Sequence, residues 1–249
     1  MKIRFLGTNG WYDDKSHNTI STLIDVKDCY LILDAGYGIT KSIKYLKKDK
    51  PIYLFLSHLH LDHIVGLHAL PLFHDKNVTI YLPVGMKRYY DILVRAPFTG
   101  LGDKFKIKEL KPGVYKSPVN FECLFLQHTV PTLGFRFNLE GKVITYCCDT
   151  TVCKNDLLLA KNADVLIHEC SNKVGTSGGW GHSNPVDVGK LAVRAKVKRL
   201  FLTHFAPNVY KKFSDRKWAE KQTKKYFLNT KIASENEVIS LPSTKNNYL

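Results

Sequence analysis

The sequence predicts a mixed α/β fold, with residues 1–249 forming a single domain. Short apolar runs rich in β-forming residues recur along the whole chain, and stretches with helical periodicity separate many of them. No long linker, low-complexity tract or sequence repeat divides the chain. A chain of this length can bury a full hydrophobic core as one domain.

The predicted strands are short runs that either alternate or are continuously apolar: 2–6, 20–26, 29–34, 51–57, 77–82, 121–127, 134–139, 142–147, 164–167 and 199–203. The predicted helices are 38–48, 62–69, 84–95, 154–161, 185–196 and 214–227. The capping signal Ser183-Asn184-Pro185 supports the start of the fifth. Segment 205–249 is poorly determined, and residues 243–249 are predicted to be disordered. The pattern by itself predicts no more than a mixed α/β domain.

The most specific motif is Ser57-His58-Leu59-His60-Leu61-Asp62-His63, which follows the apolar run 51–56. It places four metal-ligand types within six residues. His58 and His60 point the same way in an extended segment, whereas the later ligands face another direction once the chain turns. Such ligands suit Zn²⁺, Mn²⁺ or Fe²⁺, with zinc favoured where histidine dominates. A histidine-rich polar loop is the alternative, but this spacing rarely arises by chance.

Three further ligand types each follow a strand-like run. They are His128 after 121–127, Asp149 after 142–147, and His204 after 199–203. Taken singly, each could be a strand-end cap or a surface residue. The same placement at four strand ends favours one shared site.

With these residues in view, the chain resembles the metallo-β-lactamase superfamily, and within it the ribonuclease Z-like phosphodiesterases. The segments that carry the resemblance are 2–8, 31–36, 57–67, 148–150, 167–169, 181–183 and 202–205. The resemblance implies a four-layer αββα sandwich with metals at one edge of the sheets. It also implies a metal-dependent hydrolase.

Carried over residue by residue, the resemblance implies two zinc sites: His58, His60 and His128 for the first, Asp62, His63 and His204 for the second, and Asp149 bridging both. Two metals about 3.5–4 Å apart can lower the pKa of a shared water and clamp the attacking and leaving oxygens. The formal charges at such a site add up to roughly +1 for two Zn²⁺, two carboxylates and one hydroxide, because histidines bind as neutral rings. A positive centre suits an anionic phosphodiester.

The glycine-dense loop 175–185 contains His182. In ribonuclease Z-like proteins a histidine at this place is thought to contact the scissile phosphate and to help protonate the leaving group. The resemblance makes Glu169 the carboxylate that orients it. Asp62, His182 and Glu169 are therefore the expected catalytic residues, although a surface position for His182 is the alternative. Cys148 neighbours Asp149, but strand alternation predicts that it points away.

Composition agrees with an enzyme of the cytoplasm. The chain has neither a secretory pattern nor a transmembrane stretch, and its six cysteines form no C-x-x-C pair. The net charge of +15, from 37 Lys+Arg against 22 Asp+Glu, is gathered in lysine runs at 41–50, 104–116 and 211–225. Such a surface indicates either nucleic-acid binding or an ordinary solvated lysine-rich surface.

One departure from ribonuclease Z affects the choice of substrate. That family usually inserts a long arm that grips transfer RNA between the third and fourth ligand motifs, yet only 20 residues separate His128 from Asp149. The leading hypothesis is therefore a dinuclear zinc phosphodiesterase acting on a small or cyclic phosphodiester. The alternatives are a ribonuclease Z-like endonuclease acting on RNA such as the tRNA 3′ end, a thioesterase or lactonase, and a non-enzymatic binding protein. Many relatives are dimers, but no residue identifies an interface.

Overall fold

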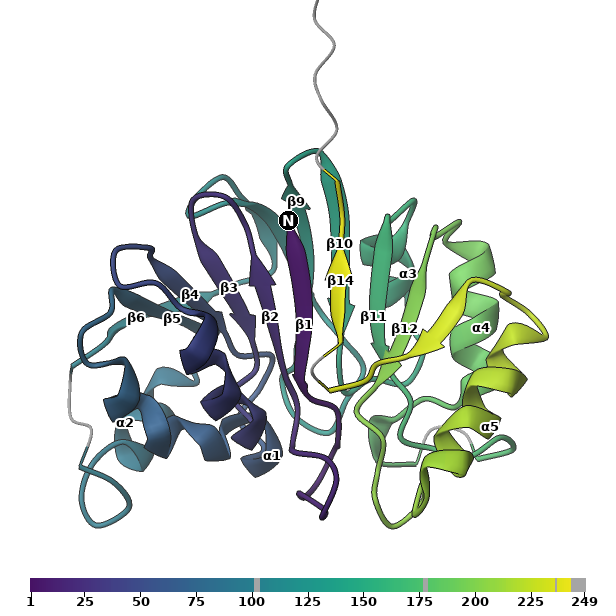
Figure 1. The fold of residues 1–249 in the computed structure, drawn as a ribbon, viewed down its shortest axis with the longest axis horizontal. Helices are drawn as coiled ribbons and strands as arrows, with labels where there is room; N and C mark the ends of the chain where they lie inside the picture. Colours follow the sequence, from purple (N-terminus) through teal and green to yellow (C-terminus); the bar gives the residue numbers. More distant parts are fainter. Residues whose placement is uncertain (101–103, 177–178, 236, 243–249) are drawn as a thin grey trace, which may run out of the picture.

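The computed structural model describes residues 1–100, 104–176, 179–235 and 237–242. Two seven-stranded mixed sheets pack face to face, and helices cover the outer face of each sheet (Figure 1). This confirms the expected four-layer αββα sandwich. The predicted disorder of residues 243–249 falls on residues outside the described part of the chain.

The first sheet has the order β14-β1-β2-β3-β4-β5-β6. Its strands are β1 (Lys2–Gly7), β2 (Ser21–Asp25), β3 (Tyr30–Leu33), β4 (Ile52–Phe55), β5 (Val78–Pro83), β6 (Lys106–Leu110) and β14 (Val238–Ser240). The pairs from β14 to β3 are antiparallel, and those from β3 to β6 are parallel. Its outer face carries the helices η1 (Tyr37–Tyr45), α1 (Leu61–Ile64), η2 (Val65–Phe73) and α2 (Lys87–Leu93).

The second sheet has the order β13-β12-β11-β10-β9-β8-β7. Its strands are β7 (Gly113–Tyr115), β8 (Asn120–Phe125), β9 (Leu133–Leu139), β10 (Lys142–Cys147), β11 (Val165–Glu169), β12 (Leu200–Thr203) and β13 (Thr230–Ile232). The pairs from β7 to β10 are antiparallel, and those from β10 to β13 are parallel, as in the first sheet. Its outer helices are α3 (Lys154–Ala160), α4 (Pro185–Arg194) and α5 (Phe213–Lys224), and the short η3 (Gly179–Gly181) precedes α4.

The parallel strands explain where the chemistry lies. Parallel neighbours bring their carboxyl ends to one edge, and β1 and β8 run in the same direction as those strands. The loops that follow these ends gather at the lower edge in Figure 1, between the two halves of the molecule. Ligand types that follow strands in the sequence therefore meet in space.

Phe55, the last residue of β4, anchors the core between the sheets. Its fully buried ring stacks on Tyr81 at 4.7 Å between centroids and meets three phenylalanine rings edge-on, at 5.1, 5.4 and 5.1 Å for Phe121, Phe135 and Phe137. Aromatic pairs at such separations add to the stabilisation from burial alone. This cluster holds β4, and with it the motif that follows, against the second sheet.

The predicted strands and the four later helices lie close to the observed elements, but four strands were missed. They are β6, β7, β13 and β14, of which three have only three residues. β6 is an edge strand whose lysines are exposed, so no apolar pattern marks it. Each short strand exists because a neighbour supplies hydrogen bonds, which a local pattern does not reveal. The predicted helix 38–48 and most of 62–69 are 3₁₀ helices.

All six cysteines are free, and five of them are buried. Among the described residues, no helix combines the length and the apolarity that crossing a bilayer requires.

Replacing Phe55 by Ala would remove a ring that packs against four others. We expect a loss of about 3–5 kcal/mol in the free energy of unfolding, measured by urea denaturation. Phe98→Ala is the matched control, because Phe98 is 65% exposed and its loss should cost no more than about 0.5 kcal/mol. Equal effects at the two positions would contradict the packing argument.

Candidate functional site

Seven side chains from both sheets converge at the lower edge. They are His58, His60, Asp62 and His63 after β4, His128 after β8, Asp149 after β10, and His204 after β12. The motif residues split as the chain turns: His58 and His60 lie in the loop, whereas Asp62 and His63 lie in the four-residue helix α1. The structure thus brings together every residue that the sequence marked as a candidate metal ligand.

Asp149 lies between two groups of histidines. Its Oδ2 is 3.6 Å from His58 Nε2 and 3.5 Å from His128 Nε2. Its Oδ1 is 3.2 Å from His63 Nε2 and 3.0 Å from His204 Nε2. These distances are close to the separation of about 3.3–3.4 Å between two ligands of one tetrahedral zinc ion. One carboxylate can therefore reach two neighbouring metal positions.

The outer members complete the two groups. His60 faces the first group with Nδ1, which is 3.2 Å from His128 Nε2. Asp62 faces the second group with Oδ2, which is 3.1 Å from His204 Nε2. Each position is thus bordered by four nitrogen and oxygen donors, a set that zinc accepts.

Two buried atoms in the cluster make no hydrogen bond within the described part of the chain: His58 Nε2 and Asp149 Oδ1. His58 Nε2 is 3.6 Å from Asp149 Oδ2, which is too far for a hydrogen bond, and Asp149 Oδ1 lies 3.2 and 3.0 Å from two histidine nitrogens without hydrogen-bond geometry. Buried polar atoms are almost always satisfied, so an orphaned pair at the centre of a ligand cluster fits a bound cation.

Electrostatics at the cluster also favours a cation. Burial acts to lower the pKa of His63, but the negative charges of Asp149, Asp34 and Asp62 outweigh it and raise that pKa well above the ordinary value. Burial likewise acts to raise the pKa of Asp149, and the charges of His204 and His63 outweigh it and hold that pKa low. The carboxylates therefore stabilise positive charge at this place, which a metal ion would supply.

Asp34, which the sequence analysis did not assign, orients the motif from behind. It follows β3, and its Oδ2 accepts from His63 Nδ1 at 2.9 Å, from Ser57 Oγ at 2.9 Å and from Tyr146 Oη at 2.6 Å. Ser57 Oγ in turn accepts from His58 Nδ1 at 3.0 Å. These bonds occupy the Nδ1 atoms and leave each Nε2 free for a metal, an arrangement common to histidine ligands.

The other two histidines that face the cluster through Nε2 are held in the same way. His204 Nδ1 donates to Ser171 Oγ at 2.9 Å, and His128 Nδ1 donates to the Gly181 carbonyl at 3.2 Å. The sequence analysis named neither partner, although Ser171 lies two residues after Glu169. No local pattern marks such partners, since each is distant in sequence from the histidine that it holds.

The loop after β1 closes the second group from the side. The Trp11 amide donates to Asp62 Oδ2 at 2.7 Å, and the Gly10 amide donates to the Phe205 carbonyl at 3.0 Å. A Cβ added to Gly10 would lie 2.6 Å from Nδ1 and 2.7 Å from Nε2 of His204, so no side chain fits there. Buried Arg216 of α5 fixes this loop through Asn9 Oδ1.

Backbone strain is concentrated at the site. Five of the eight non-glycine residues with positive φ in the described chain lie here: Trp11, Asp34, Asp149, Trp180 and His204. Their φ values run from 54° to 69°, the left-handed region that such residues rarely adopt. Strain of this kind persists where the surrounding contacts hold it, and it clusters at functional sites.

His182 and Glu169 form a dyad beside the cluster. His182 Nδ1 lies 3.1 Å from Glu169 Oε1, and the buried carboxylate also accepts backbone amides from Thr150, Ser171 and Ser183. Burial acts to lower the pKa of His182, but the hydrogen bond and charge of Glu169 raise it to about 9. The His182 ring lies 5.2 Å from that of His128 and 5.8 Å from that of His204, and its side chain is 19% exposed.

Cys148 corrects one expectation. Alternation predicted that it points away, yet its Sγ lies within 4.8 Å of the ligand atoms of His63, Asp149 and His204. Cys148 still alternates with Cys147, because it packs in the core between the sheets with Ile144 and Tyr146, whereas Cys147 packs on the outer face. The left-handed backbone at Asp149, with a φ of 56°, breaks the alternation one residue later, so the side chains of Cys148 and Asp149 lie near each other. Burial raises the pKa of the thiol well above its usual range, which makes it a poor ligand.

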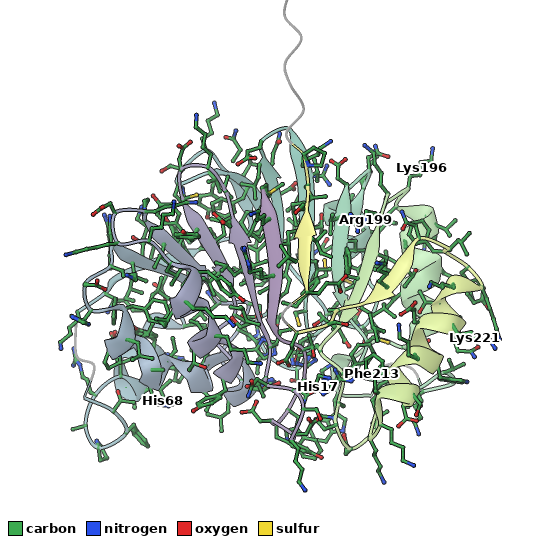
Figure 2. The ribbon with its side chains drawn as sticks, viewed as in Figure 1. His17, His68, Lys196, Arg199, Phe213 and Lys221 are labelled. Atoms are coloured by element: carbon green, nitrogen blue, oxygen red, sulfur yellow. The ribbon has the colours of Figure 1, made fainter. Side chains whose placement is uncertain are left out.

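Among the described residues, His68, His74 and His168 belong to none of the groups of candidate metal ligands. His68 stacks on Tyr37 at 5.8 Å, His74 is exposed, and buried His168 donates to the Glu169 carbonyl. Figure 2 shows His17 and Phe213 toward the lower edge of the molecule, His68 at the lower left, and Lys196 and Arg199 toward the opposite edge. Part of the basic charge is therefore remote from the site.

A family model described as the β-lactamase superfamily domain matches residues 30–205. The chain belongs to that family, and its fold and site define a hydrolase of the metallo-β-lactamase superfamily. Within the superfamily it is ribonuclease Z-like: it is 25% identical to the ribonuclease Z of Microcystis aeruginosa over 310 aligned positions, which cover 98% of each chain.

Solved structures show the same fold. The metallo-β-lactamase fold protein YhfI from Bacillus subtilis matches with a TM-score of 0.82 and 23% identity, covering 96% of this chain and 99% of that one. The short form of human tRNase Z matches with a TM-score of 0.76 and 24% identity, covering 97% and 100%.

Gly10→Ala is predicted to weaken metal binding, because the added methyl group would push the His204 ring out of place. We expect about a 10- to 100-fold loss of zinc affinity at the second group, measured by competition with a chromogenic chelator. Gly100→Ala is the control, since nothing lies within 4 Å of a Cβ at that position. Unchanged affinity in Gly10→Ala would show that His204 does not need this contact.

Proposed function

We propose that this chain is a dinuclear zinc phosphodiesterase that hydrolyses a small or cyclic phosphodiester. The observation that carries the proposal is the position of Asp149, whose two oxygens face two separate groups of histidines. His58, His60 and His128 would hold one metal, Asp62, His63 and His204 the other, and Asp149 both. Mn²⁺ or Fe²⁺ would also suit these donors.

Two observations support such a pair of ions. Among the described residues, buried ligand atoms at the centre of the cluster lack hydrogen-bond partners, and the neighbouring carboxylates favour positive charge there. A metal pair bound here would supply a water nucleophile at neutral pH and would stabilise negative charge on the phosphate oxygens. Because the two sheets contribute ligands to one cluster, we also propose that residues 1–249 act as one domain.

In this proposal, proton transfer depends on the dyad of His182 and Glu169. His182 stands beside both metal groups, and Glu169 holds it by Nδ1, so its Nε2 is free for the substrate. Protonated His182 would donate to the leaving oxygen as general acid. Glu169 is a positioning residue, since three backbone amides and the imidazole fix its carboxylate.

The connection between His128 and Asp149 supports a small substrate. It consists of β9 and β10, joined by the two-residue turn Glu140-Gly141, whose residues both have positive φ as in a tight hairpin. A hairpin of this kind leaves no arm to hold a folded RNA at this place.

RNA is the second candidate. The similarity to a protein named ribonuclease Z favours it, and so does the exposed face of α5, where Lys217 and Lys221 lie one turn apart and Lys225 follows. In Figure 2 Phe213, at the start of α5, lies toward the site edge, and Lys221 lies farther out. An RNA bound at the site could continue along this helix.

Glu169→Gln is predicted to move the alkaline limb of the kcat/KM profile. Activity that needs protonated His182 is present below its pKa and falls as pH rises through it. Removing the Glu169 charge lowers that pKa from about 9 toward the ordinary 6.5, so the limb moves to lower pH. Cations bound beside His182 would lower its pKa in the parent protein and in the variant alike, so the direction of the shift would stay the same. A limb that stays in place would exclude His182 as the titrating acid.

His182→Ala should reduce kcat by about 10²- to 10⁴-fold, the usual worth of a general acid, without changing metal content. Turnover of p-nitrophenyl diesters and zinc analysis by mass spectrometry measure the two effects. Loss of metal in this variant would make His182 a ligand, because its ring lies close to His204.

The decisive experiment is hydrolysis of bis(p-nitrophenyl) phosphate by metal-quantified protein, run beside an unprocessed transfer RNA. Turnover of the diester alone supports the proposal, and RNA cleavage that falls steeply with salt supports the second candidate. Asp149→Ala is the inactive control and should lose both metals. Metal-loaded protein that cleaves neither substrate refutes both and leaves thioester or lactone hydrolysis to test.

A further inference from the structure

Two tryptophans stand exposed at the rim of the candidate metal centre. Trp11 is 65% exposed and Trp180 is 82% exposed. Each carries a large apolar ring system that is normally well covered in a folded chain. Leu61, between two motif ligands, is 71% exposed and extends the same apolar rim.

Both tryptophans are held in strained backbone conformations by the centre itself. Their φ values are 69° and 59°, genuine outliers for bulky side chains. The Trp11 amide donates to Asp62 Oδ2 at 2.7 Å, and the carbonyl of Gly181, next to Trp180, accepts from His128 Nδ1 at 3.2 Å. A strained and exposed aromatic residue that is fixed by active-site contacts points to a function at the site.

The two residues adjoin glycines that pack on different histidine groups of the cluster. Trp11 follows Gly10, which packs on His204, so it belongs to the second histidine group. Trp180 precedes Gly181, where an added Cβ would lie 2.9 Å from His128 Nδ1, so it belongs to the first group. A phosphate held between the groups would therefore have the backbone of one tryptophan next to each group.

We propose that Trp11 and Trp180 bind the nucleobases of the substrate, so that the phosphodiester cleaved here carries a nucleoside. The inference rests on the proposed phosphodiesterase function and narrows its substrate class. Indole rings stack on any base, because every base has a π-face. A nucleotide combines this aromatic part with an anionic phosphate, and the net charge of +15 favours anionic ligands.

A second copy of the chain is the competing occupant of these aromatic faces. A protein surface seated on both tryptophans would cover the entrance between them, whereas a nucleotide would use the entrance. Tyr12 also packs edge-on against Trp11, with 5.2 Å between the ring centroids. This contact orients the indole within one chain, so no second copy is needed to hold it. The position of the pair therefore favours the nucleotide.

The test compares two diesters with the same leaving group. Thymidine 5′-(p-nitrophenyl phosphate) carries a base, and methyl p-nitrophenyl phosphate carries none. We expect Trp11→Ala and Trp180→Ala to lower the ratio of the two kcat/KM values by about 5- to 100-fold, which is the usual worth of a stacked base. Trp11→Phe and Trp180→Phe should restore much of the ratio. Trp218→Ala, on α5 and 43% exposed, is the matched control and should leave the ratio unchanged.

A second readout does not depend on turnover. Thymidine 5′-monophosphate should quench tryptophan fluorescence in the parent protein and in Trp218→Ala, but not in the Trp11→Ala/Trp180→Ala double variant. Quenching that persists in the double variant would overturn the inference, as would an unchanged ratio of kcat/KM. A dimer that dissociates in the double variant, seen by sedimentation, would assign the tryptophans to a subunit interface instead.

The outcomes separate the two proposals. If the parent protein cleaves neither diester when metal-loaded, the proposed function fails, and the quenching experiment still decides whether the tryptophans bind a base. If it cleaves both diesters with a ratio that the alanine variants do not change, the function stands and the base-binding assignment fails.

Discussion

The placement of one carboxylate between two histidine groups is the constraint on which the rest of the structure depends. Asp149 reaches both groups only because β10 ends at the edge where β4, β8 and β12 also end. Two sheets must therefore pack with their parallel strands aligned, and the aromatic cluster around Phe55 joins the strand before the motif to the facing sheet. The core thus does more than stabilise the chain, because it sets the distance between the two halves of the site.

Hydrogen bonds to the histidines of the cluster fix the orientation of their rings. Asp34, Ser171 and the Gly181 carbonyl each engage an Nδ1 atom or its serine partner, so the Nε2 atoms face inward. Left-handed backbone at Asp34, Asp149 and His204 turns each side chain sharply at a strand end. The free energy lost to strain is offset by the hydrogen bonds that hold these residues, which is common where precise orientation matters.

A compact hairpin of β9 and β10 connects His128 to Asp149 in this chain. The aligned ribonuclease Z extends over 310 positions, although this chain has 249 residues, so that relative has segments that are absent here. What this chain offers a substrate near the centre is a rim with two strained tryptophans and a basic helix that leads away from it. Under the proposed function, the tryptophan rim would suit a small nucleotide and the basic helix would suit a longer RNA.

The sequence by itself determined the kinds of ligand, their position after strands, the αββα class through the resemblance, and the pairing of His182 with Glu169. These features are local, or belong to motifs whose spacing is specific. Tertiary structure alone decided the contacts of Asp34, Gly10, Ser171 and the Trp11 amide, because each contacts a residue far away in sequence. It also decided the short edge strands, which form only where a neighbour supplies hydrogen bonds, and the position of Cys148 beside Asp149, because the left-handed backbone at Asp149 breaks the strand alternation. A local sequence pattern indicates which secondary structure a segment prefers, but only the packed structure shows which residues the segment contacts.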